Sequence, residues 1–242
     1  MTVRIAMWSG PRNISTAMMR AWENRSDTAV VDEPLYAHYL DATGIDHPMR
    51  EAVIASQPRD WRDVVARITG PAPGGKAIWY QKHMTHHMIP AVGRDWFTAV
   101  RHAFLIRNPR EMLASYAAKR ETVTPADLGA DLEAELYDEV VAHTGREPPV
   151  VDAADVLRDP RALLSKLCAA LDVPFDEAML AWPMGRRDTD GVWGAHWYGS
   201  VEASTGFLPH APRAIELPAD LEAIAEACRP HYRRLWEKRL VA

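Results

Sequence analysis

The sequence predicts an α/β fold with three layers (α/β/α) and a central parallel sheet. Short runs rich in β-branched and aromatic residues alternate along the chain with segments whose apolar residues recur at helical spacing. This alternation is typical of parallel strands joined by crossover helices that cover both faces of the sheet. Polar and basic residues directly follow several of the apolar runs. Such sheets bind ligands at the carboxyl ends of their strands, so we expect the functional site there.

Five short apolar runs are predicted as strands. Turn-forming residues bound them, such as Gly10-Pro11 after the first run and Pro34 after the second. Their length and composition fit strands that are buried on both faces. The predicted strands cover residues 3–9, 28–33, 76–84, 101–108 and 148–153.

Helices are predicted between these strands and after the last one. The helix at 15–24 has Ser15 or Thr16 as its N-cap, and the helix at 109–120 has Pro109 in its first turn. Residues 182–212 are rich in Gly, Pro, Trp and His, and they predict a long loop with short helical pieces. Further helices are predicted at 34–40, 60–68, 125–145, 159–171 and 219–240.

The composition is that of one ordinary globular domain. The 242 residues carry no linker-like stretch and no repeat, so we expect a single domain over 1–242 with a helical C-terminal segment. The formal net charge of −5 argues against a nucleic-acid binder, which needs a basic face. The two cysteines, Cys168 and Cys228, lack the spacing of a metal site. The sequence shows no signal peptide and no membrane span, which predicts a cytoplasmic protein without a membrane partner.

Residues 9–16 (SGPRNIST) connect the first predicted strand to the first helix and predict a phosphate site. A helix N-terminus offers unpaired N–H groups and the positive end of the helix dipole. Arg12 adds a guanidinium, and Ser15 and Thr16 add hydroxyls. An ordinary strand–helix turn with a capping serine is the alternative. Ile14 and Ser15 stand where a Walker A loop has Gly and Lys, which disfavours ATP or GTP hydrolysis.

Residues 104–116 (FLIRNPREMLASY) predict a second phosphate site. The strand ends at Arg107, Pro109 opens the following helix, and Ser115 lies two turns along from Arg107. An arginine at a strand end and a serine on the next helix suit the recognition of a phosphate group. The alternative is a surface arginine beside an ordinary helix serine.

The two segments together resemble the nucleotide-binding motifs of PAPS-dependent sulfotransferases, in particular of their bacterial branch. Residues 11–16 resemble the family's 5′-phosphosulfate loop, P-[KR]-S-G-[TS]-[TS], and residues 107–116 resemble its 3′-phosphate motif, RxPRDxxxSxY. Their order and separation match as well. The resemblance is clearest over residues 3–120. It implies a P-loop NTPase-like fold, PAPS as co-substrate, PAP as product and no metal.

The resemblance also implies roles for individual residues. The sequence departs from the family's pattern at two loop positions, where Ile14 replaces a glycine and Asn13 replaces a serine. The family's late motif RKGxxGxWK is echoed by residues 186–197, without its final Lys. The aromatic stretch Trp193–Tyr198, with His196, is predicted to cover the sulfate donor or the acceptor. Arg187, within residues 186–197, is a candidate for the 3′-phosphate, with a solvated turn as the alternative. The resemblance implies that PAPS is held by Arg12, Asn13, Ser15, Thr16, Arg107 and Ser115.

Sulfuryl transfer requires a base for the acceptor and a cation for the leaving oxygen. Glu33 ends the second predicted strand and is the candidate base; Asp32 competes for this role, and anchoring of the next turn is the structural alternative. Lys82 ends the third strand and resembles the family's catalytic lysine. His83 is the third catalytic candidate, although strand alternation turns it away from Lys82 unless the strand has ended. The identity of a catalytic histidine stays open.

The sequence therefore predicts a sulfotransferase that moves a sulfuryl group from PAPS to a hydroxyl or amine of a small-molecule acceptor. One alternative is a P-loop kinase-like phosphotransferase, which the missing Walker lysine disfavours. The other is a non-catalytic nucleotide-binding protein of the same fold, which Ile14 in the loop keeps open. Three nearby histidines, His83, His86 and His87, raise the question of a metal site. No Cys or carboxylate lies beside them in the sequence to complete such a site.

Overall fold

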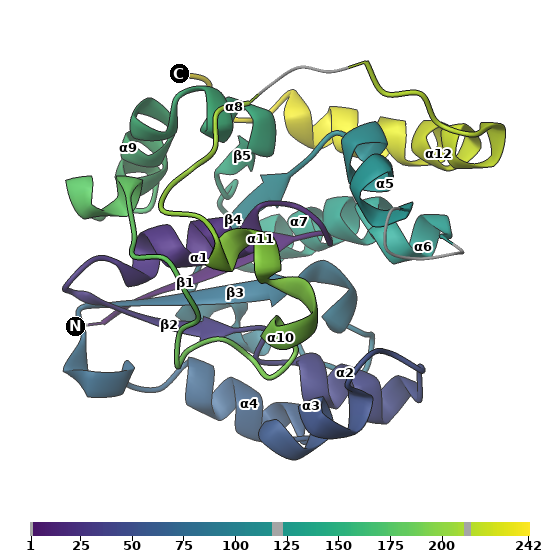
Figure 1. The fold of residues 1–242 in the computed structure, drawn as a ribbon. Coiled ribbons are helices and arrows are strands. Elements are labelled where there is room, and N and C mark those ends of the chain that lie inside the picture. The colour runs from purple at the N-terminus through teal and green to yellow at the C-terminus, as the bar shows by residue number, and fades with distance from the viewer. Residues whose placement is uncertain (1, 118–122, 211–213) are drawn as a thin grey trace.

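A five-stranded parallel sheet forms the centre of the protein (Figure 1). The computed structural model describes residues 2–117, 123–210 and 214–242. The strand order is β2-β3-β1-β4-β5, and every pairing between neighbours is parallel. The predicted fold class is confirmed. The strands are β1 (Val3–Ser9), β2 (Thr28–Asp32), β3 (Ile78–Met84), β4 (Arg101–Ile106) and β5 (Val150–Asp152).

Helices connect the strands and cover the sheet, as the sequence predicts. Between β1 and β4 they are α1 (Ser15–Glu23), α2 (Tyr36–Thr43), α3 (Arg50–Ser56) and α4 (Trp61–Ile68), with short 3₁₀ turns η1 (Pro73–Gly75), η2 (Thr85–His87) and η3 (Asp95–Ala99). After β4 they are α5 (Pro109–Ala117), α6 (Pro125–Leu128), α7 (Ala130–Thr144), α8 (Ala153–Arg158), α9 (Pro160–Ala170), η4 (Glu177–Leu180), α10 (Gly194–Trp197), α11 (Gly199–Glu202) and α12 (Ala219–Trp236).

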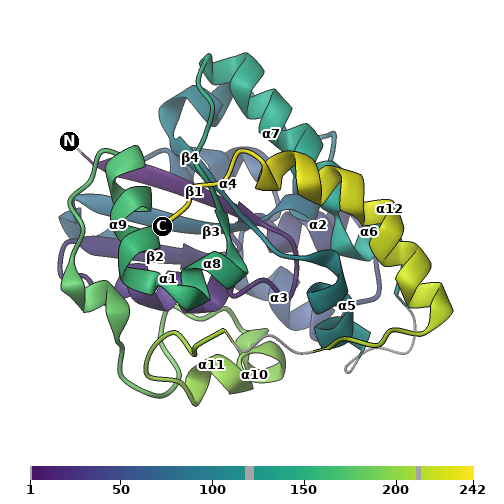
Figure 2. The same ribbon diagram turned by 90° about the horizontal axis from the view of Figure 1, so that it is seen from above.

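The sheet lies between two hydrophobic cores, because successive side chains of a strand point to opposite faces. Ile5 and Met7 of β1 pack with residues of α1, α8 and α9 in one core. Ala6 and Trp8 pack with residues of α4, η3 and α7 in the other. Figures 1 and 2 show the sheet between these two layers. The same alternation decides which polar side chains of β3 reach the functional site.

The structure corrects several predicted boundaries. The helix expected over 125–145 is broken at Gly129, whose φ of 63° is in the left-handed region that glycine adopts at low cost. Strand β2 ends one residue before the predicted end, since Glu33 has a φ of 41° and has left the extended conformation. Helices α3 and α8 were not predicted: α3 lies in the unassigned residues between the helices expected at 34–40 and 60–68, and α8 begins where the strand expected at 148–153 ends.

The C-terminal helix α12 packs on α5, α6 and α7 and also contacts β4 and β5 (Figure 2). The predicted loop after η4 folds back over the sheet. Within it, α10 and α11 lie near the carboxyl ends of β1 and β3 (Figure 1). Long segments that are remote in sequence therefore meet at the edge of the sheet where a ligand is expected. Among the described residues, no helix is long and apolar enough to span a membrane.

Candidate active site

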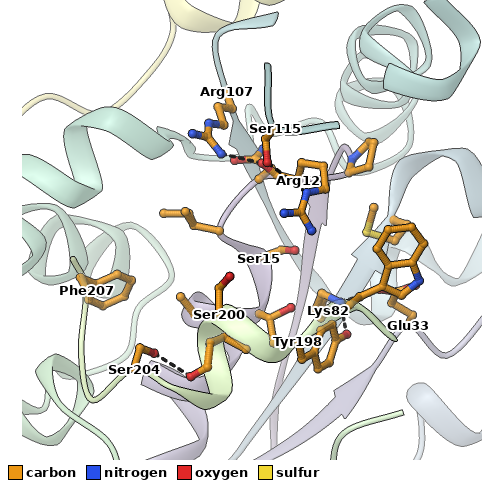
Figure 3. A pocket seen from close by; sticks show the side chains of 18 of the residues that line it. Arg12, Ser15, Glu33, Lys82, Arg107, Ser115, Tyr198, Ser200, Ser204 and Phe207 are labelled. Atoms are coloured by element: carbon orange, nitrogen blue, oxygen red, sulfur yellow. Dashed lines mark hydrogen bonds and ion pairs between the residues drawn. The ribbon is translucent and has the colours of Figure 1, made fainter. Parts of the chain in front are cut away.

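A cavity of about 360 Å³ lies at the carboxyl ends of the central strands (Figure 3). The loop after β1 forms one wall, and the ends of β2, β3 and β4 contribute Glu33, Lys82 and Arg107. The opposite wall comes from α10, α11 and the residues after them. The cavity contains most residues predicted for the site, namely Arg12, Asn13, Ser15, Thr16, Glu33, Lys82, Arg107 and Ser115.

The loop between β1 and α1 contains two non-glycine residues with left-handed backbone, a feature of many anion-binding turns. Arg12 and Ile14 both have positive φ angles, 56° and 24°. Backbone N–H groups in such turns point into a concave site, and strained residues of this kind cluster at ligand sites. Within the described part of the chain, no side chain caps the N-terminus of α1 at Ile14, and an exposed helix N-terminus favours an anion.

Asn13 attaches this loop to strand β4. It is buried, and its side-chain amide donates a hydrogen bond to the carbonyl of Leu105 in β4. Its Oδ1 has no hydrogen-bond partner among the described residues. The family's Gly at the next position is Ile14 here, and its side chain packs against the core beside α1. This packing opposes the backbone strain that its positive φ introduces.

The two predicted phosphate segments contact each other directly. Arg12 donates from Nε to Oγ of Ser115 at 3.1 Å. Arg107 donates from Nη1 to the carbonyl oxygen of Arg12 at 2.7 Å, and its Nε lies 3.1 Å from Oε2 of Glu111. Strands β1 and β4 are neighbours in the sheet, which brings the two segments together. Two guanidinium groups and a serine hydroxyl thus form one continuous wall of the cavity.

Lys82 lies at the centre of a buried polar cluster on the adjacent wall. Its Nζ is 2.8 Å from Oδ1 of Asp32, 2.5 Å from Oε1 of Glu33 and 2.8 Å from the hydroxyl of Tyr198. Lys82 is 1% exposed, so this cluster is shielded from bulk water. The parallel register pairs Asp32 of β2 with Lys82 of β3, which explains why the carboxylate and the ammonium meet.

Burial and charge set the protonation of this cluster. Burial raises the pKa of Glu33 to about 7, against the opposing effect of the Lys82 ammonium. Burial acts to lower the pKa of Lys82, but the carboxylates of Asp32 and Glu33 raise it well above its ordinary value. Lys82 therefore stays charged, whereas Glu33 titrates near neutral pH. A carboxyl group with this pKa is suited to accept a proton from an acceptor.

His83 is placed outside the cavity, contrary to its selection as a catalytic candidate. The strand continues to Met84, so Lys82 and His83 point to opposite faces of the sheet. The His83 ring packs against Trp8, with 4.4 Å between ring centroids, and its Nε2 lies 3.2 Å from Oε1 of Gln81. Burial lowers the pKa of His83 to about 3, so the ring is neutral. His83 is a core residue.

Arg187 also lies outside the cavity, so its selection for the 3′-phosphate is not supported. Its Nη2 donates to the carbonyl of Pro183 at 2.6 Å, and its Nε is 3.8 Å from Oε2 of Glu23. The segment around Arg187 is folded onto α1 and β2, away from the strand end that carries Arg107. Arg187 is half-buried and paired with Glu23, so it does not lie in the solvated turn that was the alternative either.

Several cavity residues were not predicted as site residues. Tyr36 and His47 come from the region after β2, which carried no readable motif. Tyr198 belongs to the aromatic stretch that was predicted to cover the donor or the acceptor, and it lines the cavity. His86 and His87 also line the cavity, just beyond the carboxyl end of β3. Their position directly after a strand is the sequence signal that places them at the ligand-binding edge of the sheet, although the sequence predicted no catalytic or binding role for them beyond the metal question.

The comparison with known proteins agrees with this geometry. The model of the sulfotransferase domain family matches residues 3–237. The chain belongs to the sulfotransferase domain family. The fold and the family together indicate a transferase, and more narrowly a sulfotransferase.

Solved sulfotransferases share the fold at low sequence identity. The sulfotransferase from Alicyclobacillus acidocaldarius is 15% identical with a TM-score of 0.56, over 98% of this chain and 95% of that one. The sulfotransferase domain from the curacin biosynthetic pathway is also 15% identical, with a TM-score of 0.54, over 100% and 99%. At this identity the likeness shows a shared fold alone, and the roles of the site residues depend on the geometry of this chain.

Two plant proteins are more similar in sequence. Branched-chain-amino-acid aminotransferase-like proteins 1 and 2 of Arabidopsis thaliana are 38% and 33% identical, over 84% and 94% of this chain. The sulfotransferase-family chain spans only 36% and 40% of their lengths. Their names therefore describe proteins more than twice as long as the segment that matches.

Proposed function

We propose that this chain transfers a sulfuryl group from PAPS to a hydroxyl or amine of a small-molecule acceptor. One observation carries the proposal. The Arg12–Ser115 contact joins both phosphate motifs on the wall of the same cavity that contains the Lys82–Glu33 pair. Anion-binding groups and an acid–base pair thus face one space. A cytoplasmic location and a soluble metabolite as acceptor are parts of this proposal.

The residues present fit a sulfate donor with two anionic groups. The uncapped N-terminus of α1, with Arg12, Ser15 and Thr16, would hold the 5′-phosphosulfate. Arg107 and Ser115 would hold the 3′-phosphate, which would compete with Glu111 for the Arg107 guanidinium. PAPS supplies an activated sulfuryl group when it is bound. Everything else in the reaction falls to residues of the chain.

Glu33 and Lys82 divide the chemistry between them. Glu33 in its ionised form takes the proton of the acceptor group, which makes the acceptor a better nucleophile toward sulfur. Lys82 stays cationic and stabilises the negative charge that develops on the leaving phosphate oxygen. Both side chains line the cavity, and 2.5 Å separates their charged atoms. Asp32 lies on the far side of Lys82 and does not line the cavity, so Glu33 is favoured as the base.

The acceptor is expected to bind on the aromatic side of the cavity. Tyr36 stacks on His87 with 4.6 Å between ring centroids, and Trp197 lies 5.9 Å from His47. Burial lowers the pKa of His87 well below its ordinary value, so this ring is neutral. Flat rings and neutral polar atoms suit a small organic acceptor that presents a hydroxyl or amine to Glu33.

Calorimetry with PAPS, PAP and ATP tests this proposal. We expect PAP and PAPS to bind with a Kd on the order of micromolar, and ATP to bind at least about tenfold more weakly, because the Arg107 subsite needs a 3′-phosphate. Preferred binding of ATP would favour a kinase-like phosphotransferase. A folded protein that binds none of the three would be a scaffold that retains only the fold.

A further inference from the structure

The hydroxyl of Tyr198 makes three hydrogen bonds inside the Lys82 cluster. It accepts hydrogen bonds from Nζ of Lys82 at 2.8 Å and from Nε1 of Trp193 at 2.9 Å. It donates to Oδ2 of Asp32 at 2.7 Å. A phenol has two acceptor sites and one proton, so each capacity of this hydroxyl is used. Its orientation is therefore fixed by three neighbours.

Asp32 completes this arrangement from the other side. Its Oδ1 accepts from Lys82, and its Oδ2 accepts from Tyr198 and from the backbone N–H of Gly191 at 3.1 Å. Asp32 is 3% exposed and Tyr198 is 5% exposed. A buried carboxylate that accepts three hydrogen bonds is held in one position.

A second buried carboxylate fastens the same segment to α1. Nη2 of Arg20 donates to Oδ2 of Asp190 at 2.7 Å, and Nη1 lies 2.6 Å from Oδ1. The backbone N–H of Arg187 donates to Oδ2 of Asp190 at 2.8 Å. Arg20 is 1% exposed. A charge-assisted hydrogen bond between arginine and a carboxylate, here Nη2 to Oδ2, restrains both groups. The segment that carries Tyr198 is thus attached at both Asp32 and Asp190.

The Lys82 ammonium has three protons, and the structure accounts for all three. They point to Asp32, Glu33 and Tyr198. For one N–H of Lys82 to point at the leaving oxygen of a sulfate donor, its hydrogen bond to one of these three partners must therefore break. Asp32 and Tyr198 are held by further hydrogen bonds, whereas Glu33 is the partner that loses its charge when it takes the acceptor proton.

We propose that Tyr198 is a positioning residue that, with Asp32, holds the Lys82 ammonium in place while its contact with Glu33 is the one exchanged during the reaction. This inference rests on the proposed sulfuryl transfer. The acceptor proton moves to Glu33 as the acceptor oxygen or nitrogen bonds to sulfur. The bond between sulfur and the bridging oxygen breaks, and its electron pair stays on the phosphate. Lys82 then turns the released N–H toward that oxygen and keeps its other two hydrogen bonds.

The substitution Tyr198→Phe tests the role because it removes only the hydroxyl. We expect kcat to fall about tenfold or more, while the KM for PAPS and the Kd for PAP change by less than about twofold. Tyr232→Phe is the matched control. Tyr232 also donates to a buried aspartate, Asp152 at 2.8 Å, but it lies on α12 outside the cavity. It should leave kcat within about twofold.

A double-mutant cycle shows whether Tyr198 acts through Lys82. In a Lys82→Met background, Tyr198→Phe should lower the residual kcat by no more than about twofold. Independent, multiplying effects would overturn the proposal, as would a kcat in Tyr198→Phe that matches Tyr232→Phe. Should Lys82→Met fail to fold, the comparison of kcat with KM in the two tyrosine variants decides alone.

Urea unfolding of the same proteins separates this proposal from the proposed function. If the wild type moves no sulfuryl group, the function is wrong, and the cycle of unfolding midpoints then tests the contact itself. Midpoint shifts that are not additive between Lys82→Met and Tyr198→Phe support a held ammonium, and additive shifts contradict it.

Discussion

The guanidinium of Arg12 and the hydroxyl of Ser115 share a hydrogen bond of 3.1 Å, although they lie 103 positions apart in the chain. The contact exists because β1 and β4 are neighbours and each is followed by a segment that turns toward the same cavity. Under the proposed function, recognition of the 5′ and 3′ groups of one nucleotide would depend on these two adjacent segments.

Arg12→Ala and Arg107→Ala should each weaken PAP binding about tenfold to a hundredfold. Each removes charge-assisted hydrogen bonds, which contribute about 1.5–3 kcal/mol apiece. Isothermal titration calorimetry measures the change. Arg187→Ala is the control, because Arg187 pairs with Glu23 and does not line the cavity. Equal losses in all three variants would show that the effect is general electrostatics and not a built site.

The pH dependence of kcat/KM should report the ionisation of Glu33. Because burial raises its pKa to about 7 and the base must be deprotonated, kcat/KM should rise with pH and reach half its plateau near pH 7. Glu33→Gln should lower kcat by about a hundredfold or more and remove this ascending limb. An unchanged limb in Glu33→Gln would assign the titration to another group.

His83→Ala should destabilise the protein and leave catalysis nearly intact. The ring fills the core between Trp8 and Trp96, so its loss opens a cavity and lowers the free energy of unfolding by about 2 kcal/mol or more. Urea denaturation measures this, with exposed His143→Ala as a control that should shift stability by less than about 0.5 kcal/mol. A large loss of kcat in a folded His83→Ala protein would return His83 to the mechanism.

Asp190→Ala should lower stability by about 1–3 kcal/mol, because it removes the hydrogen-bonded partner of the buried Arg20 guanidinium and leaves only the longer ion pair with Glu23 at 3.5 Å. Chemical denaturation of the variant, compared with Asp188→Ala at an exposed neighbouring position, gives the difference. A similar midpoint for both variants would mean that Arg20 finds other partners and that the segment is not fastened there.

Much of the fold could be predicted because its strands are continuous apolar runs with turn residues at their ends. The β1 and β4 runs needed no tertiary information, whereas the break at Gly129 did not follow from the helical pattern around it. A single glycine in an otherwise helical stretch is compatible with either outcome. Contacts of α7 and η2 decide the geometry there.

The site was only partly predictable for a related reason. Arg12 and Arg107 lie in local motifs, so the sequence alone could predict both as phosphate ligands, and the structure brings both to one cavity. Tyr198 and Asp32 lie 166 positions apart in the chain, and no local sequence pattern predicts their contact. For His83 the rule of alternating faces already pointed to the core, and the uncertainty was only where the strand ends.

Transfer of radioactive sulfur tests the central claim most directly. Purified protein is incubated with PAPS labelled with ³⁵S and a panel of small alcohols, phenols and amines, alongside Glu33→Gln and Lys82→Met. The proposed function predicts a labelled product and equimolar PAP with the wild type, and at least about a hundredfold less with either variant. Equal transfer by wild type and both variants, or no transfer by a wild type that binds PAPS, would contradict it.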